Sequence, residues 1–255
     1  GIVKNTGLQR YSVNFDNKSS GFDDILTLNT KISISQIEDQ AENTTDNAGF
    51  IGNIIGVGLY WNPTRDLYNT DGSVNVVSDT YLNPVDYLNS YDDQTSTTRI
   101  LASLAPKLKL TDDLSFNMVF GVDYSTSERS SALLPTFNLQ GFYNRPNPNG
   151  DDNLGGFASI NSMTRFNRTF ENYFSYNKEV SDNFSFKALL GYSYYDYNVE
   201  GNFTSARDFN PNQTNLIENI EGGLSTETRT SSFKSRNELQ SFYGRIETVI
   251  NQKLL

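Results

Sequence analysis

Long stretches in which apolar and polar side chains alternate constrain this chain more than any other feature. In residues 114–124 every second side chain is apolar, and those between are polar or small except Val119. Strand side chains point alternately to opposite faces, so this stretch predicts a strand with one apolar and one polar face. Its length matches the roughly 9–11 residues with which a β-strand crosses a membrane.

Six further stretches alternate in the same way, and we expect a strand in each of them. They are residues 8–16, 25–36, 99–110, 164–179, 184–197 and 232–250. We expect short turns at 17–24, 111–113, 180–183 and 251–253, and long polar loops at about 38–96, 129–160 and 200–225. Turns and loops then lie at opposite ends of the sheet, as in outer-membrane barrels with short periplasmic turns and long extracellular loops. The sequence predicts an all-β fold, part of an antiparallel up-and-down transmembrane barrel of seven to eight strands.

Two local features refine this prediction. Residues 49–60, within the first long loop, predict either one short helix or a buried hairpin. Pro106 lacks a backbone N–H for a central strand, so it is expected at an edge, at a bulge or near the barrel rim.

The apolar faces of three predicted strands form the expected lipid-facing surface. Its members are Leu26, Leu28, Ile32, Ile34, Leu114, Phe116, Met118, Phe120, Val122, Phe184, Phe186, Leu190 and Tyr192. A barrel with a wet interior needs apolar residues on this face alone. That agrees with a chain of 255 residues that is only 36% hydrophobic and has a mean hydropathy of −0.53.

Composition also excludes several classes of function. The formal net charge of −10 argues against nucleic-acid binding, because phosphates would be repelled. The chain has no Cys and no His, which excludes Cys/His zinc sites, thiol catalysis and His-based triads within it. The adjacent acids Asp92–Asp93 and Asp112–Asp113 fall in turns where neighbours point apart, unlike the paired carboxylates of glycosidases. We expect no catalytic residue, no cofactor and no metal site, and therefore no enzyme.

The predicted loops hold the candidate binding residues. Aromatic rings there either stack on sugar rings or pack the loops and a lid against one another. The candidates are Tyr60, Trp61, Tyr68, Phe142 and Tyr143. Asn149, Asp151 and Asp152 offer oxygen ligands for calcium, but their spacing is not that of an EF-hand, and a solvated turn is the favoured interpretation.

A run of mixed charge lies in and before the last predicted strand. It comprises Glu227, Arg229, Lys234, Arg236 and Glu238. Either it lines the lumen and contacts substrate, or it is an ordinary wet strand end, which we favour.

The two ends of the sequence indicate a fragment. Gly1 follows no initiator Met, basic region or apolar leader segment, and residues 251–255 break off as a new apolar segment begins. We expect residues 1–255 to be one stretch of barrel domain, without the plug domain.

Several phrases resemble the barrel of SusC/RagA-type TonB-dependent outer-membrane transporters of Bacteroidetes. Together they cover roughly residues 60–255. They are Asn62-Pro63 followed by 67–72, Asn83-Pro84 followed by the hairpin at 108–114 and by 121–124, then 171–178 with 188–192, and finally 241–245 with 253–255.

The resemblance implies a barrel of about 22 strands with a plugged lumen, of which this chain would form about a third. It further implies a place in the cell outer membrane, in contact with lipid, and import of oligosaccharides or peptides. The implied partners are a SusD-like surface lipoprotein and TonB, which would engage an N-terminal region missing here.

A soluble all-β domain is the alternative, either a glycan-binding module or part of a β-rich secreted hydrolase. Its apolar faces would form an interior core. Alternation alone does not say which face is inside. Strand length and loop asymmetry favour the barrel, since soluble strands usually run about 5–6 residues.

Overall fold

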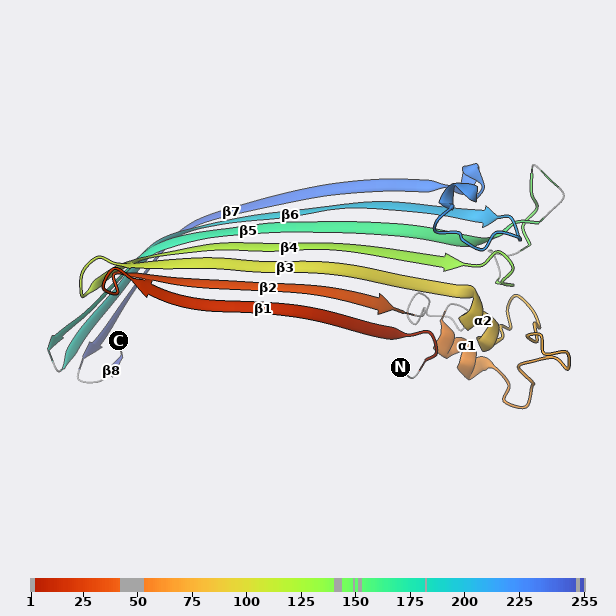
Figure 1. Ribbon diagram of the computed structural model, residues 1–255, viewed down its shortest axis with the longest axis horizontal. Helices are drawn as coiled ribbons and strands as arrows, with labels where there is room; N and C mark the ends of the chain where they lie inside the picture. The colour runs from red at the N-terminus through yellow and green to blue at the C-terminus, as the bar shows by residue number, and fades with distance from the viewer. Residues whose placement is uncertain are drawn as a thin grey trace.

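A computed structural model describes residues 3–41, 53–139, 144–148, 150, 153–181, 183–250 and 253–254. In this part of the chain eight strands form one antiparallel sheet, and each strand pairs with the next in sequence (Figure 1). The strands are β1 (Gly7–Gly21), β2 (Leu26–Gln40), β3 (Tyr91–Lys109), β4 (Leu114–Leu133), β5 (Gly155–Ser181), β6 (Phe184–Phe209), β7 (Arg229–Ile250) and β8 (Lys253–Leu254). The predicted all-β, up-and-down architecture is confirmed, and the sheet is open.

Most strands extend further toward the loops than the sequence predicted. β5 and β6 contain 27 and 26 residues and remain paired almost throughout. The residues that β3 adds, 91–98, are polar on both faces apart from Tyr91, so they lack the apolar alternation that marks a strand. The backbone hydrogen bonds of the ladder, which do not depend on side-chain polarity, hold these segments in the sheet.

The short turns lie together at one end of the sheet, as predicted (Figure 1). The first turn is shorter than expected, because residues 17–21 pair with β2 up to Gly21 opposite Leu26. The chain reverses through Phe22, Asp23 and Asp24, which all adopt positive φ angles between 54° and 61°. Residues 17–21, which were expected in the turn, are therefore the end of β1.

Pro106 lies on β3 between β2 and β4, opposite Leu28 and close to the turn end. The ladder between β3 and β4 passes from the Leu104–Phe120 pair to the Lys107–Asn117 pair. Pro106 thus sits near the rim, where the missing N–H interrupts only a short stretch of the ladder.

Two short helices fold within the first long loop. In α1 (Ile54–Tyr60) the side chain of Asn53 accepts a hydrogen bond from Gly56 N, which caps the helix. α2 (Pro84–Ser90) begins with Asn83 as its cap and Pro84 in the first turn. The predicted short helix is confirmed as α1, whereas α2 was not predicted.

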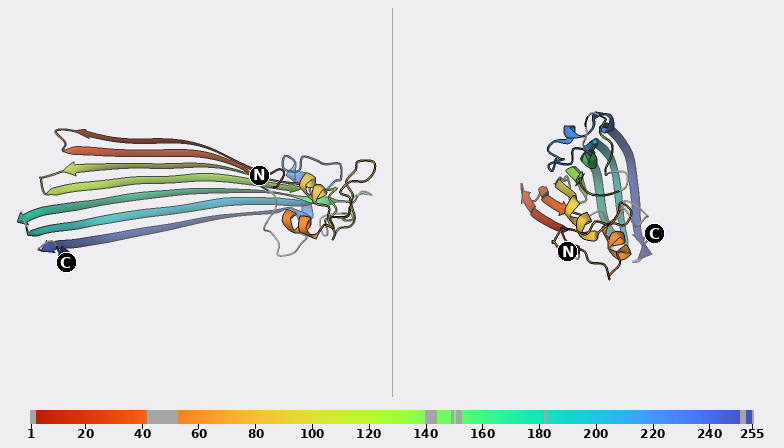
Figure 2. Two further views of the ribbon diagram at one scale, coloured as in Figure 1. Left: turned by 90° about the horizontal axis from the view of Figure 1, so that it is seen from below. Right: turned by 90° about the vertical axis from the view of Figure 1, so that its right-hand side faces the viewer.

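The sheet is curved, and its two faces carry different loops at the loop end (Figure 2). α1 and α2 pack on its concave side. Ile54, Val57, Leu82 and Tyr87 form a core with Leu133 of β4 and Phe137. The 210–228 loop, with its short helices η1 (Ile220–Gly222) and η2 (Ser225–Glu227), packs instead on Ala158 and Ala206, whose side chains belong to the opposite face. The concave face is therefore the one that holds Leu133, and residues an even number of positions from it on β4 share that face.

None of the helices in the described part of the chain is long and apolar enough to cross a membrane.

Candidate functional site

An apolar belt crosses the convex face of the sheet near the turn end. It covers residues 26–34 of β2, 100–108 of β3, 114–124 of β4, 166–176 of β5, 184–194 of β6 and 242–250 of β7, where every second side chain points outward and most are apolar. All the side chains expected to face lipid lie here: Leu26, Leu28, Ile32, Ile34, Leu114, Phe116, Met118, Phe120, Val122, Phe184, Phe186, Leu190 and Tyr192. The belt is 9–11 residues wide on each of these strands, about the length that crosses a bilayer.

Pairs of aromatic rings join neighbouring strands inside the belt. The ring centroids of Phe116 and Phe174 lie 4.8 Å apart, and those of Phe120 and Phe170 lie 5.1 Å apart. Tyr192 and Phe242 make a further pair at 5.1 Å between β6 and β7. Such directly opposed pairs stabilise a sheet beyond the burial of their area.

The belt runs obliquely across the strands. The row of paired residues that includes Ile34 on β2 reaches Arg236 on β7, but the outermost apolar residue of β7 on this face is Phe242, six positions nearer the turns. The row that includes Leu26 likewise reaches Gly244, and the belt on β7 continues six positions further, to Ile250.

Both edges of the belt thus shift by the same amount between β2 and β7. Six residues at about 3.3 Å, over five strand spacings of about 4.8 Å, correspond to an inclination of about 40°. Strands of transmembrane barrels tilt by about 35–45°. If the belt lies parallel to the membrane plane, these strands are therefore tilted from the membrane normal as in such a barrel.

The apolar side chains of the belt are exposed in the isolated sheet. Phe242 is 85% exposed, Ile246 71% and Leu190 66%. The accessible surface of the chain is 16304 Å², whereas a compact soluble protein of 28.7 kDa would expose about 11,000 Å². In the described part of the chain, no second sheet covers the belt.

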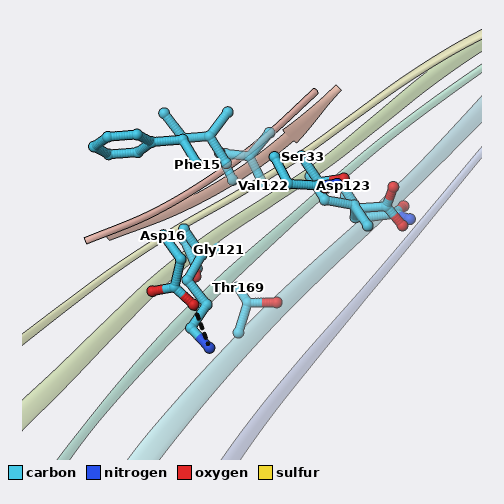
Figure 3. A pocket seen from close by; sticks show the side chains of 14 residues that line it. Phe15, Asp16, Ser33, Gly121, Val122, Asp123 and Thr169 are labelled. Atoms are coloured by element: carbon cyan, nitrogen blue, oxygen red, sulfur yellow. Dashed lines mark ion pairs between the residues drawn. The ribbon is translucent and has the colours of Figure 1, made fainter. Parts of the chain in front are cut away.

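The concave face opposite the belt is polar. A hollow of about 490 Å³ lies where Gly121 contributes no side chain, between Ser103 and Thr169 on the neighbouring strands (Figure 3). Asp16 and Lys31 form an ion pair of 3.3 Å at its margin, and Phe15 points to the opposite side of the sheet from Asp16 (Figure 3). The polar lining of this hollow contains hydroxyls, amides and charges: Asn14, Asp16, Lys31, Ser33, Ser103, Asp123, Asn167 and Thr169.

Ion pairs fix polar side chains on this concave wall. Arg99 donates two hydrogen bonds of 3.0 Å to the carboxylate of Asp123 on the next strand. Nearer the loops, Asp93 is 1% exposed and accepts hydrogen bonds from Arg129 and from the hydroxyl of Tyr91. These contacts give the concave face the chemistry of a wall in contact with water.

The candidate aromatic residues of the first loop have different surroundings. Trp61 is buried, stacks on Tyr81 at 5.1 Å and donates a hydrogen bond to Arg65 O. That contact agrees with the packing role weighed for it. Tyr60, which lies edge-on to Tyr81, and Tyr68 are each more than half exposed.

The other loop candidates cannot be placed. Phe142 and Tyr143 lie outside the described residues, as do Asn149, Asp151 and Asp152. For the two aromatic residues, stacking on sugars and packing of the loops both stay open, and for the other three residues the favoured solvated turn stays a prediction.

The mixed charge run of β7 lies largely on the convex face. Lys234, Arg236 and Glu238 share that face with Phe242, just beyond the loop-side edge of the belt. The alternative in which this run lines the lumen is therefore wrong for these three residues. Arg236 donates hydrogen bonds to Asp196 of β6, a contact that connects residues 40 positions apart and that the sequence pattern did not reveal.

Comparisons with known proteins agree with this geometry. The chain is 27% identical over 254 residues to the TonB-dependent receptor P3 of Formosa agariphila, and 26% identical over 268 residues to TonB-dependent receptor P26 of the same organism. These matches include 96% and 100% of this chain but 24% of each relative, so the chain spans about a quarter of their length. No family model matches the chain.

Solved structures share the fold. The RagAB peptide transporter superposes with a TM-score of 0.74 at 15% identity, over 97% of this chain and 27% of that one. The RagAB peptide importer in its "open-open" state gives the same score and identity over 97% and 26%. Together with the curated relatives, these matches confirm the family resemblance drawn from the sequence phrases.

Proposed function

The chain resembles the SusC/RagA-type TonB-dependent transporters in sequence and in fold, and we propose that it forms about a third of the wall of such a barrel in the cell outer membrane. The belt carries this proposal. A surface 9–11 residues wide, apolar on the convex side and inclined by about 40°, has the dimensions of a lipid-facing barrel wall. The polar concave wall then faces the lumen.

We assign a role to each surface on this basis. The thirteen convex-face side chains from Leu26 to Tyr192 named above contact lipid. The exposed rings Tyr60 and Tyr68, with Phe142 and Tyr143, belong to extracellular loops that meet substrate or partner. Residues 1–255 contribute barrel wall only, and they catalyse no covalent reaction.

The substrate we propose is an oligosaccharide or a peptide, captured with a SusD-like surface lipoprotein acting as a lid. The structurally similar RagAB protein is a peptide transporter, which favours a peptide among the two substrate classes. Energy would come through TonB, engaged by a part of the protein outside these residues.

The soluble alternative is less well supported. Its apolar faces would have to form a covered core, whereas among the described residues the belt lies uncovered on the convex side of a single sheet. The polar face lies on the concave side, where a soluble barrel would place its core.

Epitope tags in the full-length protein test the proposed placement. One tag is inserted in the 210–228 loop and another in the turn at 111–113, each in cells with an intact outer membrane. We expect antibody to label the loop tag only and to reach the turn tag after permeabilisation. Equal labelling of both tags on intact cells, or recovery of the protein in the soluble fraction, would contradict the proposal.

Uptake measurements then test the substrate. Labelled peptides and labelled oligosaccharides are offered to cells with and without the full-length gene, and again after TonB depletion. We expect one class of compound to enter only when both the gene and TonB are present. Uptake that is independent of TonB would indicate a passive pore instead.

A further inference from the structure

A cluster of charged side chains interrupts the convex face at the loop-side edge of the belt. Asp196 of β6 is fully buried between Arg168 of β5 and Arg236 of β7. Arg236 donates from Nε and Nη2 to the two carboxylate oxygens at 3.0 and 3.2 Å, and Arg168 donates to one of them from Nη2. Asn198 Nδ2 completes the set at 2.9 Å. One carboxylate thereby orients two guanidinium groups.

A hollow of about 330 Å³ lies beside this cluster on the same face. It is lined by Thr164, Phe166, Arg168, Asn198, Val199, Glu200, Lys234 and Arg236. Three of the lining residues are cations and one is an anion. The guanidinium of Arg168 lies over the Phe166 ring, with its Cζ 5.5 Å from the ring centroid, which adds a cation–π contact.

The cations are presented at the surface while the central anion is not. The side chains of Arg168, Arg236 and Lys234 are 50%, 52% and 72% exposed, against 0% for Asp196. Lys234 pairs with Glu200 at 2.9 Å and Arg236 with Glu238 at 2.5 Å, so the whole cluster is close to neutral. The bonds to Asp196 use Nη2 of both arginines and Nε of Arg236, which leaves the Nη1 groups outside these bonds.

The position of the hollow indicates what it binds. Phe166 and Tyr194 mark the loop-side edge of the belt on β5 and β6, and the hollow begins beside them. A lipid whose acyl chains covered the belt would therefore bring its headgroup to this level. Guanidinium groups bind phosphate oxygens in paired hydrogen bonds.

We propose that this hollow binds the phosphate of an outer-leaflet lipid headgroup whose acyl chains lie on the belt. The inference rests on the proposed membrane placement of the belt. Because the cluster is close to neutral overall, the phosphate would be met by the exposed N–H donors of Arg168, Arg236 and Lys234 and not by a net positive charge. Lipid held here would anchor β5, β6 and β7 at the outer membrane surface.

Lipid retention by the purified full-length protein tests this site. The protein is placed in nanodiscs of phosphatidylcholine that contain phosphatidic acid as the phosphate-bearing probe, and native mass spectrometry counts the lipids that remain bound. Lys234→Gln is the main variant, because it leaves Asp196 and both arginines in place and should fold. Arg168→Gln is the second variant. Arg99→Gln is the matched control, since it removes an equally exposed, ion-paired arginine from the concave face.

We expect the native protein to retain phosphatidic acid in preference to phosphatidylcholine. Lys234→Gln should lower that preference about fivefold, which corresponds to roughly 1 kcal/mol for one basic side chain near a charged membrane surface. Arg168→Gln should lower it at least as much, and Arg99→Gln should not change it.

Several results would overturn the inference. Equal retention of the two lipids, or an equal loss in Arg99→Gln and Lys234→Gln, would show that the hollow does not select phosphate. Displacement of phosphatidic acid by inorganic phosphate alone would show a site for a free anion. Failure of the native protein to enter the nanodiscs would overturn the belt itself, and with it the proposed function.

Discussion

Phe116 and Phe174 lie directly opposite each other on β4 and β5, with their ring centroids 4.8 Å apart on the convex face. Four residues along β4, Phe120 and Phe170 repeat the contact at 5.1 Å. Both pairs belong to the belt and have no second layer over them among the described residues. Close aromatic packing thus lies on the side that a soluble barrel would turn to water.

A charge introduced into the belt should be costly. Phe120 lies near the middle of the belt on β4, so Phe120→Arg places a guanidinium close to the centre of the bilayer. We expect the free energy of unfolding from lipid vesicles to fall by about 2–4 kcal/mol. Urea titration of the full-length protein folded into vesicles measures this change.

Ser103→Arg is the matched control for that substitution. Ser103 lies opposite Gly121, the residue after Phe120, but on the concave face beside the 490 Å³ hollow. The new guanidinium has water and space there, so the unfolding free energy should change by less than about 1 kcal/mol. Equal losses in the two variants would show that the two faces do not differ in their surroundings.

Asn83 should hold the first loop in its fold. It is 2% exposed, its side chain accepts a hydrogen bond from Val85 N, and it donates to Leu67 O and Asn75 O. Asn83→Ala leaves those buried groups unpaired, and we expect a local destabilisation of about 2–3 kcal/mol. Hydrogen exchange should accelerate in residues 62–90 and not in β4. Asn89→Ala, an exposed change in the same helix, is the control and should leave exchange unchanged.

The same loop should respond to pH through Asp86. Burial raises the pKa of this carboxyl above its ordinary value of 3.8. The folded loop therefore binds the proton more tightly than the unfolded loop, so its stability falls as the pH rises from 3.8 through the raised pKa. Asp86→Asn should remove this loss and make the loop more stable at neutral pH, as measured by hydrogen exchange across that range.

Asp71, in the same loop, should make stability depend on pH in the opposite direction to Asp86. Hydrogen bonds from the side chain and the backbone of Ser73 lower its pKa below 3.8. The stability that the ionised Asp71 carboxylate gives the folded loop is fully present above pH 3.8 and is lost as the pH falls through the lowered pKa. Asp71→Asn should therefore weaken the turn at neutral pH, and the same direction of change in Asp71→Asn and Asp86→Asn would contradict this account.

Close packing on the concave wall should make Gly191 intolerant of a side chain. A Cβ there would lie 2.5 Å from Cζ of Tyr243 and 2.8 Å from Cβ of Tyr173, which is fixed close to the backbone. We expect Gly191→Ala to lower the unfolding free energy by about 1–3 kcal/mol. Gly244→Ala is the control, because the nearest atoms there lie at 3.5 and 3.8 Å, and its effect should be small.

The sequence predicted the belt better than the rest of the sheet. Alternation fixed the face of every belt residue from Leu26 to Tyr192, because only one side of those strands is apolar. It stopped short where both faces are polar, as in residues 91–98, which still pair with β4. The overlooked helix α2 did carry a signal, since Asn83-Pro84 is a typical helix start.

The sequence pattern could not predict the cluster around Asp196, for a different reason. Arg168 and Arg236 lie 28 and 40 positions from Asp196 in the sequence, and the register of three strands brings them together. Arg236 was noticed only as part of a charge run. Once the register is known, the even spacing from Phe242 places it on the convex face with Arg168.

Paired labels on β4 show directly which face of the sheet meets lipid. The sequence has no Cys, so single cysteines at 116, 118, 120 and 122, and at 117, 119, 121 and 123, can each carry a fluorophore in a cysteine-free full-length protein. In vesicles, the first set should be quenched by a quencher attached to lipid chains and the second set by a water-soluble quencher. Quenching in the reverse order, or without alternation, would contradict the account.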